Sequence, residues 1–103
     1  MCNMLDVKKL QKEVYQNKLD KGFNTTDINK EFCRIHEEVS EAYHAWNKKI
    51  PDLGAELADV VLYILGLSEI LDIDLEQEIL DKFEVIKKRQ YKMVNGVSQK
   101  ISE

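Results

Sequence analysis

The segment Leu53–Leu71 constrains this chain more than any other, because it is apolar around most of its circumference. Thirteen of its 19 residues are apolar, and the run Val60–Leu65 contains no polar side chain apart from one tyrosine hydroxyl. A helix that is apolar on all sides is buried against several neighbours or spans a membrane. Three acids, Glu56, Asp59 and Glu69, interrupt the segment and disfavour a membrane span. We therefore expect the central helix of a soluble domain.

The rest of the chain also has the pattern of a helical protein. Only four Gly and one Pro occur in 103 residues, too few for the many turns of an all-β fold. Turn residues separate four helical segments, at about 5–21, 27–48, 53–71 and 75–92. Asn95-Gly96 is a turn signal, and we expect a frayed tail from about residue 97. The sequence thus predicts one all-α domain over residues 1–103, an antiparallel four-helix bundle.

Composition narrows the class of protein. The chain has 19 acidic and 15 basic residues, a formal net charge of -4, which argues against a protein that coats DNA or RNA. Cys2 and Cys33 lie far apart and form no CxxC motif, so we expect reduced thiols rather than a disulfide framework. The first residues lack the apolar run of a signal peptide. We expect a cytoplasmic protein that contacts neither a membrane nor a nucleic-acid polymer.

Two helical segments each carry a pair of acids spaced three apart. Glu56 and Asp59 share one face of the apolar third segment, where an acid is rare unless it is paired or binds a metal. Glu38 and Glu41 repeat the spacing in the second segment. There they flank an apolar stripe, and we expect its last residue to pack in the core or in an interface. The stripe is made of Ile28, Phe32, Ile35, Val39, Ala42 and Trp46.

If the two helices lie antiparallel with these pairs facing each other, four carboxylates converge. Two like charges about 5–6 Å apart repel by roughly 3 kcal/mol at an effective dielectric of about 20, whereas a whole domain is stable by about 5–15 kcal/mol. Cations or raised pKa values make such a cluster tolerable. Hard oxygen ligands suit Mg²⁺ or Mn²⁺. Because Mg²⁺ usually shares carboxylates with substrate phosphates, the cluster indicates metal-assisted phosphoryl chemistry.

The spacing of these acids resembles that of the MazG-like family, all-α nucleoside triphosphate pyrophosphohydrolases. The family pattern is EExxE, a spacer and ExxD, and this chain has EEVSE at 37–41 and, after 14 residues, ELAD at 56–59. RIHEEVSEAYHAW and GAELADVVLYIL resemble the second and third helices of the family, and the likeness covers about residues 28–96. Lys82 and Arg89 match basic positions of the fourth helix. Relatives often carry Asn where this chain has Ile86.

The resemblance implies hydrolysis of a nucleoside triphosphate, in particular a dNTP, to the monophosphate and pyrophosphate by a metal-activated water. It implies Mg²⁺ held by Glu38, Glu41, Glu56 and Asp59, with Mn²⁺ as a substitute. Glu38 or Glu41 would orient or deprotonate the water, and Lys82 and Arg89 would contact the phosphates. The residue at Glu37 is often not acidic in relatives and is left out of the ligand set. The resemblance also implies a homodimer or homotetramer that completes the bundle.

Two other functions fit the same residues. Phosphoribosyl-ATP pyrophosphohydrolases belong to the same superfamily, and the sequence separates them poorly from enzymes that act on (d)NTPs. In a non-catalytic helical dimerisation module, the four acids would be ordinary surface charge. Glu38 and Glu41 alone fit this second interpretation, since EExxE strings are common on helices, but Glu56 and Asp59 within an apolar helix favour a metal site.

Overall fold

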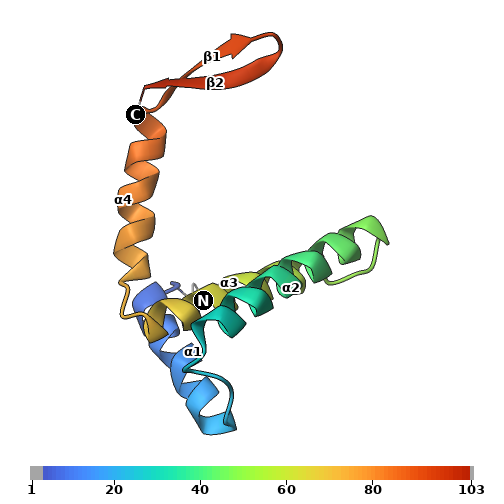
Figure 1. Ribbon diagram of the computed structural model, residues 1–103, viewed down its shortest axis with the longest axis vertical. Coiled ribbons are helices and arrows are strands. Elements are labelled where there is room, and N and C mark those ends of the chain that lie inside the picture. The colour runs from blue at the N-terminus through green and yellow to red at the C-terminus, as the bar shows by residue number, and fades with distance from the viewer. Residues whose placement is uncertain (1–3, 103) are drawn as a thin grey trace.

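The computed structural model describes residues 4–102, which form four helices followed by a β-hairpin (Figure 1). The helices are α1 (Val7–Lys21), α2 (Ile28–Asn47), α3 (Leu53–Ile70) and α4 (Leu75–Lys88). The first three agree with the predicted segments to within two residues at each end. The prediction of a mainly helical chain is therefore confirmed. None of the helices in this described range is long and apolar enough to cross a membrane.

Aspartate side chains begin three of the four helices. The carboxylates of Asp6, Asp27 and Asp74 accept hydrogen bonds from backbone amides three residues later, at 3.0, 3.1 and 3.2 Å. Such caps satisfy amides that have no partner within the helix. Asp52 precedes α3, but it adopts φ +78° and its side chain makes no capping hydrogen bond.

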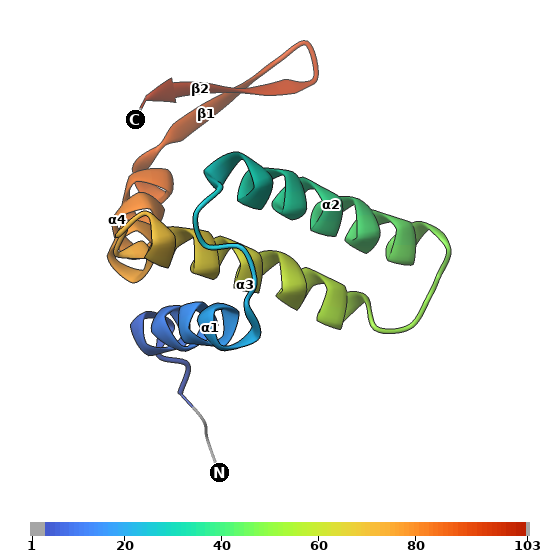
Figure 2. The same ribbon diagram turned by 60° about the horizontal axis from the view of Figure 1, so that its bottom comes forward.

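The first three helices form one layer with α3 in the middle (Figure 2). The loop after α2 reverses the chain, so α2 and α3 lie antiparallel, and α1 packs on the other side of α3. The buried apolar residues are small on α2 and large on α3, namely Ala42, Ala45, Leu65 and Leu67. The two alanines let α2 approach α3 closely, and this approach sets the distance between the acids of the two helices.

A buried ion pair ties α1 to α2. The Nζ atom of Lys18 lies 2.5 Å from Oε1 of Glu31, and both side chains are almost completely buried. Gly66 of α3 makes room for the lysine, because a Cβ atom there would lie 2.7 Å from Lys18 Cε. Since removing one member of a buried pair leaves an uncompensated charge, this pair fixes how α1 and α2 sit across α3.

The apolar stripe of α2 is only partly buried within one chain. Phe32, Val39 and Trp46 are each about half exposed, at 49%, 50% and 63%. The side of α2 that faces its neighbours instead carries Glu31, Glu38 and the alanines. In one chain, therefore, the most apolar face of α2 points away from α1 and α3.

Helix α4 leaves this layer (Figure 1). Its first turn is held to α1 by the Lys8–Asp74 ion pair at 3.1 Å and by Glu76, whose Oε1 accepts a hydrogen bond from the Val7 amide at 3.1 Å. Beyond that turn, α4 projects away from α2 and α3. A single chain therefore does not form the predicted four-helix bundle.

The end of α4 and the tail correct the sequence analysis. The helix ends at Lys88, not near residue 92, and the tail is not frayed: β1 (Gln90–Val94) pairs antiparallel with β2 (Val97–Ser102). Asn95 and Gly96 join the strands with φ +52° and +78°, and two consecutive positive φ values are characteristic of the type I′ hairpin turn. The predicted turn was correct, but its role in a hairpin was missed.

Candidate metal centre

Three acids from two helices converge on the α2–α3 interface. Glu38 of α2 and Glu56 and Asp59 of α3 each offer a carboxylate oxygen, and these oxygens lie within 4.8 Å of one another. Glu56 and Asp59 meet because they are one turn apart on α3, and Glu38 faces them because α2 runs antiparallel. The structure thus brings together three of the four predicted ligands; they are called the acidic cluster below.

One carboxylate oxygen of the acidic cluster lacks a hydrogen-bond partner within residues 4–102. The Oε2 atom of Glu56 is buried and has no such partner among the described residues. A buried carboxylate oxygen without a partner carries a desolvation cost that native structures normally avoid. A cation bound between the carboxylates would satisfy this oxygen.

The crowding of the acids also affects the pKa of Glu38. Burial raises the pKa of Glu38 above its ordinary value, and the negative charges of Glu41 and Asp59 raise it further, while Arg34 opposes them. Both causes act against the charged form. A bound divalent cation would reverse the second cause, because it favours the deprotonated carboxylate.

Glu41, the fourth predicted ligand, is exposed at the edge of the acidic cluster. Its charge and a side-chain hydrogen bond both act on Glu38, so it lies beside Glu38, but it is not one of the three acids whose oxygens converge. Glu37, which was excluded from the ligand set, pairs instead with Arg34 at 3.2 Å. The donor set is therefore three clustered carboxylates with a fourth beside them, the hard oxygen ligands that Mg²⁺ and Mn²⁺ prefer.

A polar contact that the sequence analysis missed borders the acidic cluster. Nη2 of Arg34 donates a hydrogen bond to the Tyr63 hydroxyl at 3.1 Å. Arg34 lies four residues before Glu38 on α2, and Tyr63 lies four residues after Asp59 on α3. The i, i+4 spacing from the predicted ligands was the available signal, since it places both side chains on the same side of their helices as the acids.

Next to the acidic cluster lies a small hollow, the side pocket, with a volume of about 190 Å³. Asp59 forms one of its walls, and the other lining residues are Val14, Asn17, Lys18, Phe23, Leu62 and Tyr63. A second hollow of about 400 Å³ shares Lys18, Phe23 and Tyr63 with it and continues to Arg34. The acids therefore border a partly aromatic, partly polar recess.

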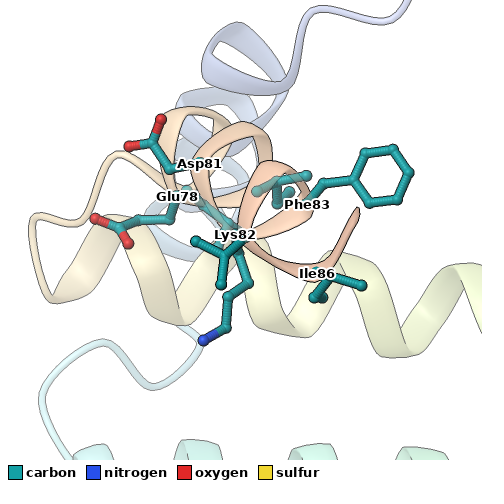
Figure 3. A pocket seen from close by; sticks show the side chains of 8 residues that line it. Glu78, Asp81, Lys82, Phe83 and Ile86 are labelled. Carbon is teal, nitrogen blue, oxygen red and sulfur yellow. The ribbon is translucent and has the colours of Figure 1, made fainter. Parts of the chain in front are cut away.

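Lys82 and Arg89, the predicted phosphate contacts, lie elsewhere in the chain. Both follow the C-terminal end of α3, whereas Glu56 is in the first turn of that helix. The Lys82 side chain extends from α4 (Figure 3) and is exposed, and Arg89 is the half-buried residue that follows the last turn of α4. The fold of one chain does not bring them to the acidic cluster.

Comparison with known proteins adds no further constraint. The chain matches no protein-family model, no curated protein and no solved structure. The functional interpretation below therefore depends on the motif spacing and on the geometry of the acidic cluster.

Proposed function

We propose that this protein hydrolyses a nucleoside triphosphate, in particular a dNTP, to the monophosphate and pyrophosphate with the help of Mg²⁺ or Mn²⁺. One observation carries the proposal: carboxylate oxygens of Glu38, Glu56 and Asp59 converge within 4.8 Å, and Oε2 of Glu56 is buried without a hydrogen-bond partner among the described residues. An all-carboxylate site of this kind is typical of Mg²⁺ shared with substrate phosphates. The EExxE and ExxD spacing of the MazG-like family supports the same chemistry.

The chain's own groups have distinct tasks in this proposal. Glu38, Glu56 and Asp59 would hold the cation, with Glu41 completing the set from the edge. When bound, the cation supplies positive charge opposite the phosphates and makes water more acidic. Glu38 or Glu41 would then orient the attacking water or accept its proton.

The side pocket would receive the nucleoside. It borders Asp59 and offers two aromatic rings, Phe23 and Tyr63, together with the amide of Asn17. Aromatic rings stack on any base, whereas amides can hydrogen-bond to base edges or to the sugar. A triphosphate on the acidic cluster thus has a neighbouring recess for its base, which a simple acidic surface patch would not provide.

Positive charge for the phosphates is nearest on α2. Arg34 lies one turn from Glu38 and is oriented by Tyr63, and its fixed guanidinium geometry suits phosphate oxygens. Within one chain, α4 lies away from the acidic cluster. Lys82 and Arg89 would therefore contact the phosphates only of a nucleotide bound at the acidic cluster of another subunit. This requirement fits the proposed homodimer or homotetramer.

The direct test is pyrophosphate release from a panel of common and oxidised NTPs and dNTPs, with Mg²⁺ or with EDTA. The proposal predicts release that requires the metal and leaves the monophosphate. Release only from phosphoribosyl-ATP would assign the alternative activity. If no nucleotide is turned over and Mg²⁺ does not change the melting temperature, the non-catalytic module would be the better description.

A further inference from the structure

The hollow of about 400 Å³ next to the side pocket gathers positive charge in a chain that is acidic overall. It is called the basic recess below, and its charged lining residues are Lys18, Lys30, Arg34 and Glu31. Three positive charges and one negative charge leave a formal excess of two positive charges, whereas the whole chain has a net charge of -4. A concave surface with this sign of charge attracts anions.

The one acid of the basic recess is already neutralised within the protein. Oε1 of Glu31 pairs with Lys18, and Oε2 accepts a hydrogen bond from the side-chain amide of Asn24 at 3.0 Å. Asn24 also accepts a hydrogen bond from the Asp27 amide at 3.0 Å, which fixes the loop between α1 and α2 at the edge of the recess. The positive charge that remains for a ligand is therefore that of Lys30 and Arg34.

These two basic residues follow the acidic cluster along α2 at regular intervals. Lys30, Arg34 and Glu38 are each four residues apart, so one step along the helix axis is about 6 Å. Arg34 thus lies about 6 Å and Lys30 about 12 Å from Glu38 along the axis. In the opposite direction the next charged residue is another acid, Glu41. A row of phosphates that begins at the acidic cluster therefore meets positive charge first when it runs toward Lys30.

Arg34 and Lys30 differ in how firmly they are held. The guanidinium of Arg34 donates to the Tyr63 hydroxyl at 3.1 Å and pairs with Glu37 at 3.2 Å, so its position is fixed by two neighbours. Lys30 is exposed and takes part in none of the ion pairs within residues 4–102. Its ammonium group can therefore move to an anion without giving up a partner in the described part of the chain.

The side pocket is too small to hold a whole nucleotide. Its volume is about 190 Å³, whereas pockets for ligands of this size are about 300–1,000 Å³. The basic recess adds about 400 Å³ and shares Lys18, Phe23 and Tyr63 with the side pocket, so the two hollows adjoin. With the base in the side pocket and one phosphate at the acidic cluster, the basic recess is the adjoining cavity for the remaining phosphates.

We propose that the basic recess binds the two terminal phosphates of the triphosphate, Arg34 the β-phosphate and Lys30 the γ-phosphate, and that Lys30 thereby selects triphosphates over diphosphates. The inference rests on the proposed hydrolysis, because the acidic cluster sets where the row of phosphates begins. A diphosphate is too short to reach the second basic residue of the row. After hydrolysis the same two residues would hold the pyrophosphate, which should compete with the next substrate molecule.

A binding comparison tests the selection by Lys30 without turnover. The ligands are the non-hydrolysable α,β-imido analogues of one dNTP and of the corresponding dNDP, and calorimetry with Mg²⁺ measures both dissociation constants. We expect the wild type to bind the triphosphate about 10-fold more tightly or better, because the contact with Lys30 is a hydrogen bond between charged groups. Lys30→Gln should bind both analogues about equally.

Lys12→Gln is the matched control for Lys30→Gln. Lys12 is an exposed lysine of α1 that lines neither hollow, so this variant should keep the preference for the triphosphate. Melting followed by circular dichroism verifies that both variants fold like the wild type. In the hydrolysis assay, added inorganic pyrophosphate should inhibit the wild type competitively, and its inhibition constant should rise about 10-fold in Lys30→Gln.

The outcomes separate this inference from the proposed function. Metal-dependent pyrophosphate release by the wild type, with an unchanged triphosphate preference in Lys30→Gln, would overturn the role of the basic recess and leave the hydrolysis standing. An unchanged inhibition constant for pyrophosphate in Lys30→Gln would do the same. If the wild type binds neither analogue and releases no pyrophosphate from any nucleotide, both the inference and the proposed function fail.

Discussion

The guanidinium of Arg34 and the hydroxyl of Tyr63 are joined by a hydrogen bond of 3.1 Å across the α2–α3 interface. Arg34 lies one helical turn from Glu38, and Tyr63 lies one turn from Asp59. The same antiparallel packing that gathers the acids thus places a cation and an aromatic ring beside them. In the proposed function, the acids would bind the nucleotide's metal ion, the guanidinium would contact its phosphates and the ring would stack on its base.

Arg34→Gln should weaken nucleotide binding more than it slows turnover. A hydrogen bond to a charged group is worth about 1.5–3 kcal/mol, so we expect KM to rise by about 10-fold or more. Steady-state pyrophosphate release over a range of substrate concentrations measures this change. Tyr63→Phe keeps the ring and removes only the hydroxyl, so its effect should be smaller. Unchanged KM in both variants would show that the nucleotide does not reach this edge.

Glu38→Gln and Asp59→Asn should abolish pyrophosphate release while the fold remains intact. Loss of even an outer partner of a metal ligand typically costs 10–100-fold, so removal of a ligand should cost about 100-fold or more. Glu37→Gln is the matched control, because Glu37 adjoins Glu38 but points to Arg34. Equal activity of all three variants would disprove the ligand assignment.

Without metal, stability should change with pH through Glu38. Its folded-state pKa is raised, so between the unfolded and folded pKa values the folded state holds more protons than the unfolded state. Stability therefore falls as pH rises through that window. Glu38→Gln should be more stable than the wild type at neutral pH, and this advantage should vanish below the unfolded pKa of glutamate. Urea unfolding at several pH values measures the difference. A mutant that is less stable at neutral pH would contradict this account.

Mg²⁺ should reverse that order. A ligand that binds only the folded state stabilises it by about 2.7 kcal/mol when present at 100 times its dissociation constant. The wild type should then melt at a clearly higher temperature with Mg²⁺, whereas Glu38→Gln should respond weakly. A scanning melt with Mg²⁺, or with EDTA as the control, shows whether the repulsion is relieved by a cation.

The Lys18–Glu31 pair should contribute strongly to stability. Breaking a buried ion pair by removing one partner typically costs about 3–5 kcal/mol, so Glu31→Gln should lower the free energy of unfolding by about that amount. Replacing both residues, Lys18→Met with Glu31→Leu, should recover much of the loss. Denaturant unfolding of both variants measures this. A double variant as unstable as the single one would mean that the charges themselves hold α1 and α2.

The helix boundaries could be predicted from the sequence where they depend on residues close together in the chain. Asp27 and Asp74, a residue type that favours helix N-termini, directly precede α2 and α4 and cap them. The direction of α4 could not be predicted, because it depends on contacts between residues far apart in the sequence, such as Lys8 and Asp74. The hairpin was missed because its strands are short, although Asn95-Gly96 marked its turn.

The same distinction applies to the candidate site, where local spacing could be predicted from the sequence and contacts between helices could not. The three-residue spacing of Glu56 and Asp59 predicts that both lie on one face of α3. The short loop before α3 makes α2 antiparallel to it, so Glu38 can face them. The exposure of Phe32 and Trp46 was not predictable, because alanines rather than the large apolar residues of α2 face α3. The Arg34–Tyr63 contact depends on the exact register between the two helices, which no single-helix pattern contains.

The central claim is that carboxylates of α2 and α3 jointly bind a divalent cation, and the most direct measurement is a titration with Mn²⁺ followed by electron paramagnetic resonance. The wild type should remove free Mn²⁺ from solution and release it when Mg²⁺ is added in excess. Glu56→Gln should lose this binding and Glu37→Gln should keep it. Equal Mn²⁺ binding by the wild type and Glu56→Gln, or none by either, would contradict the account.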